Sequence, residues 1–151
     1  MSANLDFSAV LTSLTAKGAA ALREAAVVTA EEMEVSGVVA VLARTGMLES
    51  LQAVGQGARP AFVELAQRKA RTAFNMGRST SNQRNRMAER GQGREDFMGV
   101  VECLLKGGVA IFADQRCSIL IGAIGFSGGG EDEDQEICMR AVEMVGFFTD
   151  L

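Results

Sequence analysis

The 151-residue sequence predicts one α+β domain in which helices flank a five-stranded antiparallel sheet. Three observations lead to this prediction: stretches with the apolar spacing of amphipathic helices, five short apolar segments rich in β-branched residues, and glycine-rich breaks between those segments. A chain of this length buries roughly 70% of the surface that it exposes when unfolded, so it can form a core of its own. We expect that core within residues 14–151, preceded by an N-terminal arm at residues 1–13.

The first half of the chain is expected to fold as helix, hairpin and helix. In the first helix, Leu22, Ala26 and Ala30 recur at steps of four and form one apolar stripe. The β-rich run that follows is closed by the turn "RTG" and returns as a second strand. Pro60 suits the first turn of the next helix, because a first turn leaves its N–H groups unpaired. The predicted elements are a helix at residues 16–34, strands at 38–42 and 47–54, and a helix at 60–76.

The second half is expected to supply the rest of the sheet and a closing helix. A polar connection with a short helix inside it comes first. Three apolar segments follow, separated by glycine and by the tight turn "DQRC", and have the length and β-branched content of strands. After them Ile137, Ala141, Met144 and Phe148, at steps of three and four, predict a buried helical face. The predicted elements are strands within residues 98–105, 108–114 and 117–128, and a helix at 131–147.

Basic side chains are concentrated between Arg59 and Arg94. That segment holds nine basic and two acidic residues, a net charge of +7, whereas the rest of the chain holds six basic and 17 acidic residues, a net charge of −11. An acidic chain with one arginine-rich segment indicates a local anion site. No nucleic-acid partner is expected, because the isoelectric point is 4.9 and residues 75–96 offer no aromatic ring for stacking. The alternative is that these arginines form a solvated helix face and pair with acids of the same or a neighbouring subunit.

Residue types that the sequence lacks exclude many kinds of catalytic site. It contains no histidine, tryptophan or tyrosine, so it has no Ser-His-Asp relay and no histidine-ligated zinc or haem. Proton transfer near neutral pH would need a carboxylate, a lysine or a cysteine with a shifted pKa.

Cysteine usage and hydropathy indicate a cytoplasmic protein. The cysteines are odd in number, lack the spacing of metal ligands and lie in apolar surroundings, so we expect reduced core residues and no metal site. They are Cys103, Cys117 and Cys138. No apolar run reaches the roughly 18 residues that span a bilayer, and no charged segment with an apolar core opens the chain. We therefore expect neither a membrane partner nor a secretion signal.

The stretch "GFSGGGEDED" joins the last predicted strand to the last helix, in the order typical of phosphate-binding loops. No lysine follows its glycines, as a GxxxxGK[ST] loop requires, and no second parallel strand follows the helix. The acids at positions 131–134 stabilise the start of the helix through its dipole and would repel a phosphate there. The sequence therefore predicts a tight turn with acidic capping, in which Gly125 leaves room for a packed helix and Gly128 has a positive φ.

Three motifs resemble the GlcG/HbpS-like family. "GAIGFSGG" and the acid-rich helix start after it are similar to the family's closing "GAIGVSGG", "KARTAFNMGRST" to its "KAYTAAxxGRPT", and "VVAVLARTGMLESL" to its "VAVVDxxGxLVAL" hairpin. The resemblance spans about residues 14–147, with Arg44 in place of the family's aspartate and Ser79 in place of its proline. It implies a profilin-like sandwich that assembles into homo-oligomers of up to eight subunits. Family members include haem-binding and haem-sensing proteins, and domains attached to some cobalamin adenosyltransferases.

The anion site and the resemblance lead to a first hypothesis, an oligomeric protein of four to eight subunits that binds an anionic, partly apolar small molecule. A haem-like tetrapyrrole or an aromatic carboxylate fits that description, and any haem would be held without a histidine ligand. The candidate residues are Lys69, Arg71, Thr72 and Arg78 for the anion, and Phe74 and Phe126 for an apolar wall. The two phenylalanines would equally suit the core.

The second hypothesis is a cofactor-independent isomerase, hydratase or lyase that acts on a small carboxylate. Lys69 is its candidate base or Schiff-base former, provided that burial and neighbouring arginines lower its pKa. Glu102 is expected to reach Lys69 from the sheet. Turnover of an added carboxylate that is lost in Lys69→Ala would favour the enzyme, whereas stoichiometric binding without turnover would favour the binding protein.

Overall fold

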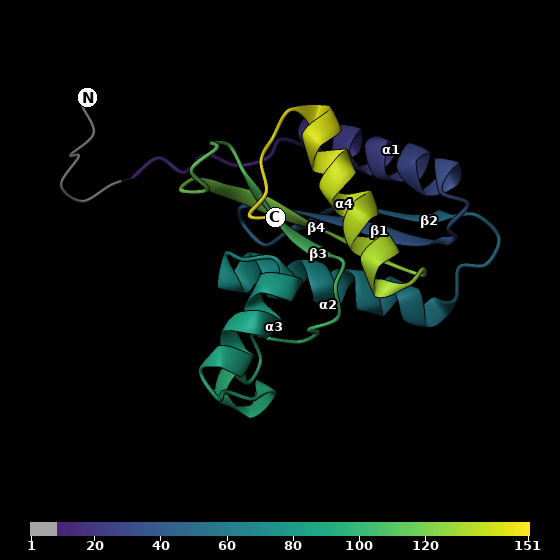
Figure 1. Cartoon of the computed structure of the whole chain (residues 1–151). Coiled ribbons are helices and arrows are strands. Elements are labelled where there is room, and N and C mark those ends of the chain that lie inside the picture. Colours follow the sequence, from purple (N-terminus) through teal and green to yellow (C-terminus); the bar gives the residue numbers. More distant parts are fainter. Residues whose placement is uncertain (1–8) are drawn as a thin grey trace, which may run out of the picture.

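The structure of the chain is a computed structural model that describes residues 9–151 (Figure 1). Its elements are α1 (Ala16–Glu32), β1 (Gly37–Ala43), β2 (Leu48–Val54), α2 (Pro60–Met76), α3 (Thr80–Glu89), the 3-10 helix η1 (Arg94–Phe97), β3 (Gly108–Phe112), β4 (Leu120–Ser127) and α4 (Glu131–Val145). The strands form one antiparallel sheet in the order β2-β1-β4-β3, and the predicted hairpin is the pair β1 and β2. The predicted α+β class is confirmed. Of the arm predicted at residues 1–13, positions 1–8 lie outside the described residues.

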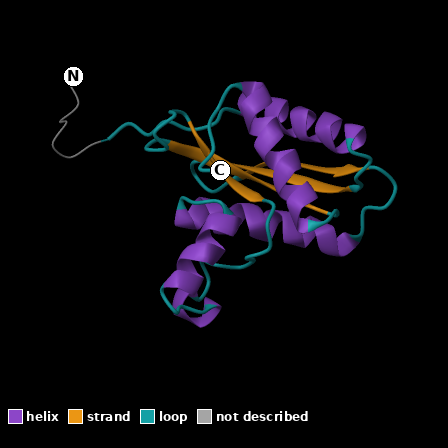
Figure 2. Ribbon diagram, in the orientation of Figure 1, coloured by secondary structure: helices purple, strands orange, loops and turns teal. Residues whose placement is uncertain are grey.

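Helices cover both faces of the sheet (Figures 1 and 2). α1 and α4 pack against each other and against one face, whereas α2 packs on β1, β3 and β4 at the other face, with α3 beside it. The main core lies under α1 and α4, where Val39, Ile111 and Ile124 of the strands meet Leu22 and Ala26 of α1. The apolar stripe predicted for the first helix is therefore confirmed as its buried face.

The backbone of α2 lies close to the sheet because small residues face it. Ala40, Gly125 and Gly108 are neighbours across β1, β4 and β3. A Cβ atom on Gly125 would overlap the carbonyl oxygen of Ala66 and would lie 2.9 Å from the backbone nitrogen of Ala70. The prediction that Gly125 leaves room for a packed helix is confirmed.

The turn before α4 needs glycine for a different reason. Gly128 has a φ of 151°, and a Cβ atom there would overlap the carbonyl oxygen of Ser36. L-residues rarely adopt this φ, so a side chain at position 128 would strain the turn. The predicted positive φ is confirmed.

The segment at residues 98–105, which the sequence predicts as a strand, is not one. It runs beside α2, where the backbone N–H of Glu102 donates to Thr72 Oγ1 at 2.9 Å. The outer edge of β3 is paired instead with Phe148, whose backbone exchanges two hydrogen bonds with Phe112. A residue from beyond α4 therefore takes the edge position of a fifth strand, and the sheet has four strands within the described residues.

Two helices end earlier than predicted, where the backbone turns left-handed. α1 stops before Glu34, which has a φ of 57°, and α4 ends at Val145 because Gly146 has a φ of 92°. Phe148 thus leaves the helix and is 38% exposed, and Met144 is 59% exposed, so the prediction that this helix buries both is wrong. The bounds of α2 are as predicted.

Candidate functional site

Lys69, the residue expected to bind an anion or act as a base, is buried between α2 and the sheet and is 1% exposed. Its Nζ donates to the carboxylate of Asp134 at 2.9 Å and to the carbonyl oxygen of Phe126 at 3.0 Å. Gly107 lies against it, since a Cβ atom there would be 3.1 Å from Nζ. The ammonium group is therefore enclosed and paired by the protein itself.

Asp134 has a different role from the helix cap that the sequence predicts. It is 2% exposed, and its second carboxylate oxygen accepts the N–H of Gly129 at 2.8 Å. Burial raises the pKa of Asp134, while Lys69 and the backbone donors act in the opposite direction. The start of α4 is capped instead by Glu133, whose carboxylate accepts the N–H of Gly130 at 2.9 Å. The prediction of acidic capping holds for Glu133, whereas Asp134 fixes α4 to α2.

Arg71 and Glu102 pair with each other. Nε and Nη2 of Arg71 donate to the two carboxylate oxygens of Glu102 at 2.7 and 2.9 Å. This two-point hydrogen bond is the main reason that the pKa of Glu102 is lowered and the pKa of Arg71 is raised. The expectation that Glu102 reaches Lys69 is wrong, because its segment lies beside α2 and outside the sheet.

The other predicted residues of α2 and β4 lie apart from one another. Thr72 donates to the carbonyl oxygen of Arg68 and holds the segment after η1. Phe74 is half-buried, with the guanidinium of Arg44 at 5.8 Å from its ring centroid. Phe126 is fully buried in the core under α1 and α4. The two phenylalanines belong to opposite faces of the sheet and do not form one apolar wall.

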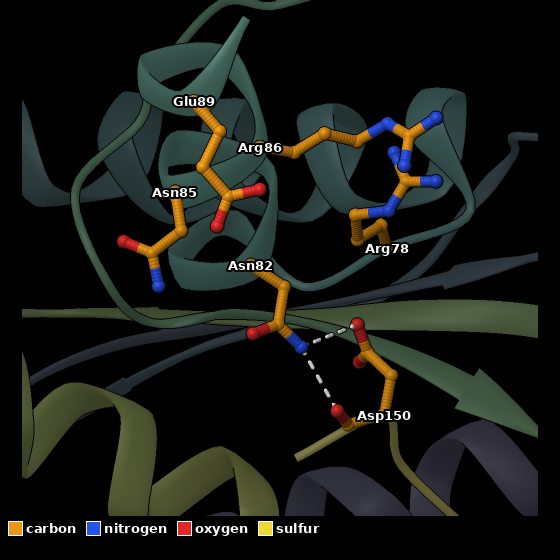
Figure 3. Close-up of a pocket in the computed structure, with 6 residues that line it drawn as sticks. All are labelled: Arg78, Asn82, Asn85, Arg86, Glu89 and Asp150. Carbon is orange, nitrogen blue, oxygen red and sulfur yellow. Dashed lines mark hydrogen bonds between the residues drawn. The ribbon is translucent and has the colours of Figure 1, made fainter.

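Arg78 is the predicted site residue that lines a surface pocket. This pocket of about 410 Å³ lies between α3 and the residues after α4 (Figure 3). Every side chain that lines it is polar or charged: Arg78, Asn82, Asn85, Arg86, Glu89 and Asp150. Figure 3 shows the guanidinium groups of Arg78 and Arg86 close together, with Asn82 and Asp150 on the side of the pocket nearer the sheet.

The pocket lining contains two cations, Arg78 and Arg86, and two carboxylates, Glu89 and Asp150. Burial lowers the pKa of Arg78, and the positive charge of Arg86 lowers it further, while Asp150 opposes both. Arg78 donates to the side-chain oxygen of Gln83 at 2.8 Å, a neutral partner. Among residues 9–151, no salt bridge joins Arg78 or Arg86 to a carboxylate. The two guanidinium groups form the cationic part of a pocket whose lining, with Glu89 and Asp150 included, has no net formal charge.

Sequence reasoning missed most of this pocket. The missed residues of α3 are Asn82, Asn85, Arg86 and Glu89. They recur at steps of three and four, the spacing of one helix face, so a helix assigned to the whole polar connection would have grouped them. Nothing in the sequence signals that Asp150 joins them.

The described residues offer no metal centre. No three Asp, Glu or Cys side chains among residues 9–151 are arranged to hold a metal ion. The cysteines are free: Cys103 and Cys138 are buried, whereas Cys117 is half-buried in the turn between β3 and β4. Burial raises the pKa of both Cys117 and Cys138, which keeps them as thiols. Over the same residues, no helix combines the length and apolarity required to cross a membrane.

The fold and the pocket define a small α+β protein with a polar surface pocket. The chain belongs to the HbpS-like family, since the family model described as "Haem degrading protein HbpS-like" matches residues 14–143. The resemblance deduced from the three sequence motifs is thereby confirmed.

Solved structures of similar chains extend this comparison. HbpS is 28% identical with a TM-score of 0.81, over 97% of this chain and 99% of that one. A double mutant of Streptomyces reticuli HbpS is 27% identical with a TM-score of 0.80, over 97% and 95% of the two chains. PduOC, in a complex with haem, is 26% identical with a TM-score of 0.79, over 93% of this chain and 100% of that one. No curated protein matches the chain.

Proposed function

We propose that this protein binds a small molecule through a carboxylate of that molecule, in the pocket lined by Arg78 and Arg86. The observation that carries the proposal is the pair of guanidinium groups, which have no ion-pair partner among residues 9–151. Guanidinium groups bind carboxylates through charge-assisted, often paired, hydrogen bonds. Asn85 adds an amide group on the same helix face, which can donate to the ligand as well.

The known proteins support a ligand of this kind. The similar chain PduOC has been solved in a complex with haem, and the description of the family model names a haem-degrading protein. Haem carries two propionate groups, which are carboxylates. An aromatic carboxylate presents the same group on a smaller apolar body, so the two ligand classes expected from the sequence share the chemistry that the pocket recognises.

The pocket fits the propionates of haem, but it does not fit the macrocycle or the iron. Its six lining residues are all polar or charged, so they supply no apolar wall. They also include no histidine, cysteine, methionine or tyrosine, the side chains that hold haem iron in proteins. We therefore expect any haem to bind at this pocket through its propionates alone, weakly and with an affinity that falls as salt is added.

The enzyme hypothesis lacks comparable support. Its candidate base, Lys69, is buried, is paired with Asp134 and does not line the pocket. A Schiff base requires a neutral amine that the substrate can reach. The geometry of Lys69 favours a structural role.

Arg78→Met is expected to weaken binding of haemin and of benzoate roughly tenfold or more, because it removes a charged hydrogen-bond donor and leaves a side chain of similar length. Haemin binding is followed through the Soret band and benzoate binding by titration calorimetry. Arg59→Met is the matched control, because it removes the same charge from an exposed position at the start of α2. Its affinities should stay within about twofold of the wild type. A low-spin haemin spectrum with tight binding that Arg78→Met leaves unchanged would contradict the proposal.

We also infer that the binding form is a homo-oligomer of four to eight subunits. Within residues 9–151, β2 pairs with a strand on one side only, and at its other edge Met47 is 62% and Leu51 is 41% exposed. Partner subunits commonly cover such edges and apolar side chains. Light scattering should give a mass at least four times the 16.0 kDa of one chain. A monomer at micromolar concentration would contradict this inference.

A further inference from the structure

The residues after α4 cross the protein as a strap that reaches the anion pocket. This strap comprises residues 146–151. Phe148 exchanges backbone hydrogen bonds of 2.9 and 3.0 Å with Phe112 at the edge of β3. The thiol of Cys117 donates to the carbonyl oxygen of Thr149 at 3.3 Å. These few contacts hold the strap to the sheet edge and place the next residue, Asp150, at the start of α3.

Asp150 fills a set of donors suited to a carboxylate. Its side chain accepts the backbone N–H of Ser79 at 2.9 Å, the hydroxyl of Ser79, and the amide of Asn82 at 3.0 Å. The Asn82 amide also donates to the backbone oxygen of Asp150 at 2.8 Å. The first turn of α3 has no acidic residue of its own, so Asp150 supplies the negative charge that a helix start favours.

The same carboxylate lies in the pocket with the two arginines. Asp150 lines it together with Arg78 and Arg86, and Figure 3 shows the Asn82 amide turned toward Asp150. A ligand carboxylate drawn to the arginines therefore meets a negative charge that is already in place. It also meets an asparagine whose amide is already engaged.

We propose that Asp150 is an internal competitor for the anion pocket and that a bound carboxylate displaces the strap. The proposal rests on the proposed function, since it concerns the same site. Phe147 packs against the main core, so the displacement concerns residues 148–151, of which Phe148 is already 38% exposed. These residues are held by the Phe148 backbone pair, the Cys117 thiol contact and the hydrogen bonds of Asp150, and a ligand carboxylate can take over the Ser79 and Asn82 donors of that last set. Residues with few buried contacts are the ones that open at low free-energy cost. The ligand class that gains most has a carboxylate able to take over the Ser79 and Asn82 donors.

The first test compares Asp150→Asn with the wild type by benzoate calorimetry. The substitution keeps an oxygen that can accept from Ser79 but removes the charge, so the affinity for benzoate is expected to rise about fivefold or more. Glu143→Gln is the matched control, because it makes the same charge change on the exposed surface of α4. Its affinity should stay within about twofold of the wild type. An affinity of Asp150→Asn no higher than that of the control would overturn the proposal.

The second test uses the wild-type protein, so it does not depend on a variant folding. Hydrogen exchange of the Phe148 amide, which is bonded to Phe112, is followed with and without saturating benzoate. Displacement of the strap predicts faster exchange when benzoate is bound, whereas most ligands slow the exchange of nearby amides. Exchange that slows or stays the same would overturn the competitor role.

The two proposals fail in different ways. If Arg78→Met weakens binding but Asp150→Asn does not strengthen it, the pocket is an anion site and the competitor role is wrong. If neither the wild type nor Asp150→Asn binds benzoate or haemin, the proposed function itself is wrong, and the strap proposal is wrong with it.

Discussion

Gly125→Val is expected to lower the free energy of unfolding by about 3 kcal/mol or more. The Cβ atom alone would overlap the carbonyl oxygen of Ala66 and approach the Ala70 side chain to 3.1 Å. These atoms belong to α2, so the helix backbone must move off the sheet before the new side chain fits. A flexible side chain could yield at small cost, but a hydrogen-bonded helix backbone cannot. Urea unfolding followed by circular dichroism gives the measurement.

The matched control for this substitution is Gly18→Val. Gly18 also lies in a secondary-structure element, in the first turn of α1, but the nearest atom to an added Cβ is 3.4 Å away. Valine has a somewhat higher helix propensity than glycine, so the stability of this variant should stay within about 1 kcal/mol of the wild type. If Gly125→Val unfolds at the wild-type urea concentration, the close packing of α2 on the sheet is wrong.

The sequence predicts correctly the features that local chemistry decides. α2 spans Pro60–Met76 as expected, because a proline in the first turn and apolar residues at helical spacing are both read from neighbouring positions. The roles of Gly125 and Gly128 are predictable for a similar reason. A glycine between apolar strand residues often marks a close approach of another backbone, and a glycine in a tight turn often has a positive φ.

The predictions fail where a distant segment decides the structure. The β-branched residues at 98–105 suit a strand, but the edge of β3 is paired with Phe148, from beyond α4. Asp134 is predicted to cap the helix with its neighbours, because four consecutive acids at a helix start favour its dipole when they are exposed. Its burial depends on Lys69, which is 65 positions away along the chain. Periodicity and composition carry no information on such a pairing.

The candidate site likewise has a part that local sequence indicates and a part that only the fold brings together. Arg78 is a candidate from the sequence because it lies in a charged segment that also carries a family motif, and it lines the pocket. The rest of the pocket comes from one face of α3 and from Asp150, which is 71 positions from its partner Ser79. Lys69, Arg71 and Thr72 share the motif with Arg78, but each has a partner within the protein. A motif therefore indicates a region of the chain, and only the fold separates the residue that lines the pocket from those that have partners within the protein.

Lys69→Met and Asp134→Leu are each expected to destabilise the protein by about 3 to 5 kcal/mol, because each leaves a buried charge without its partner. Both side chains are at most 3% exposed, and their polar atoms lie 2.9 Å apart. Lys106→Met is the comparison, since it breaks a solvent-screened pair with the exposed Asp132 and should leave the stability close to that of the wild type. Urea unfolding of the three variants provides the values.

The double variant Lys69→Met/Asp134→Leu separates a structural pair from a catalytic lysine. Apolar side chains of similar volume replace both charges, so the variant should recover at least half of the stability that either single variant loses. Because Lys69 does not line the pocket, the double variant should also bind benzoate within about twofold of the wild type. A double variant that is stable but no longer binds benzoate would place Lys69 in the ligand site after all. A double variant as unstable as the sum of the single ones would show that the two side chains do not stabilise the fold as a pair.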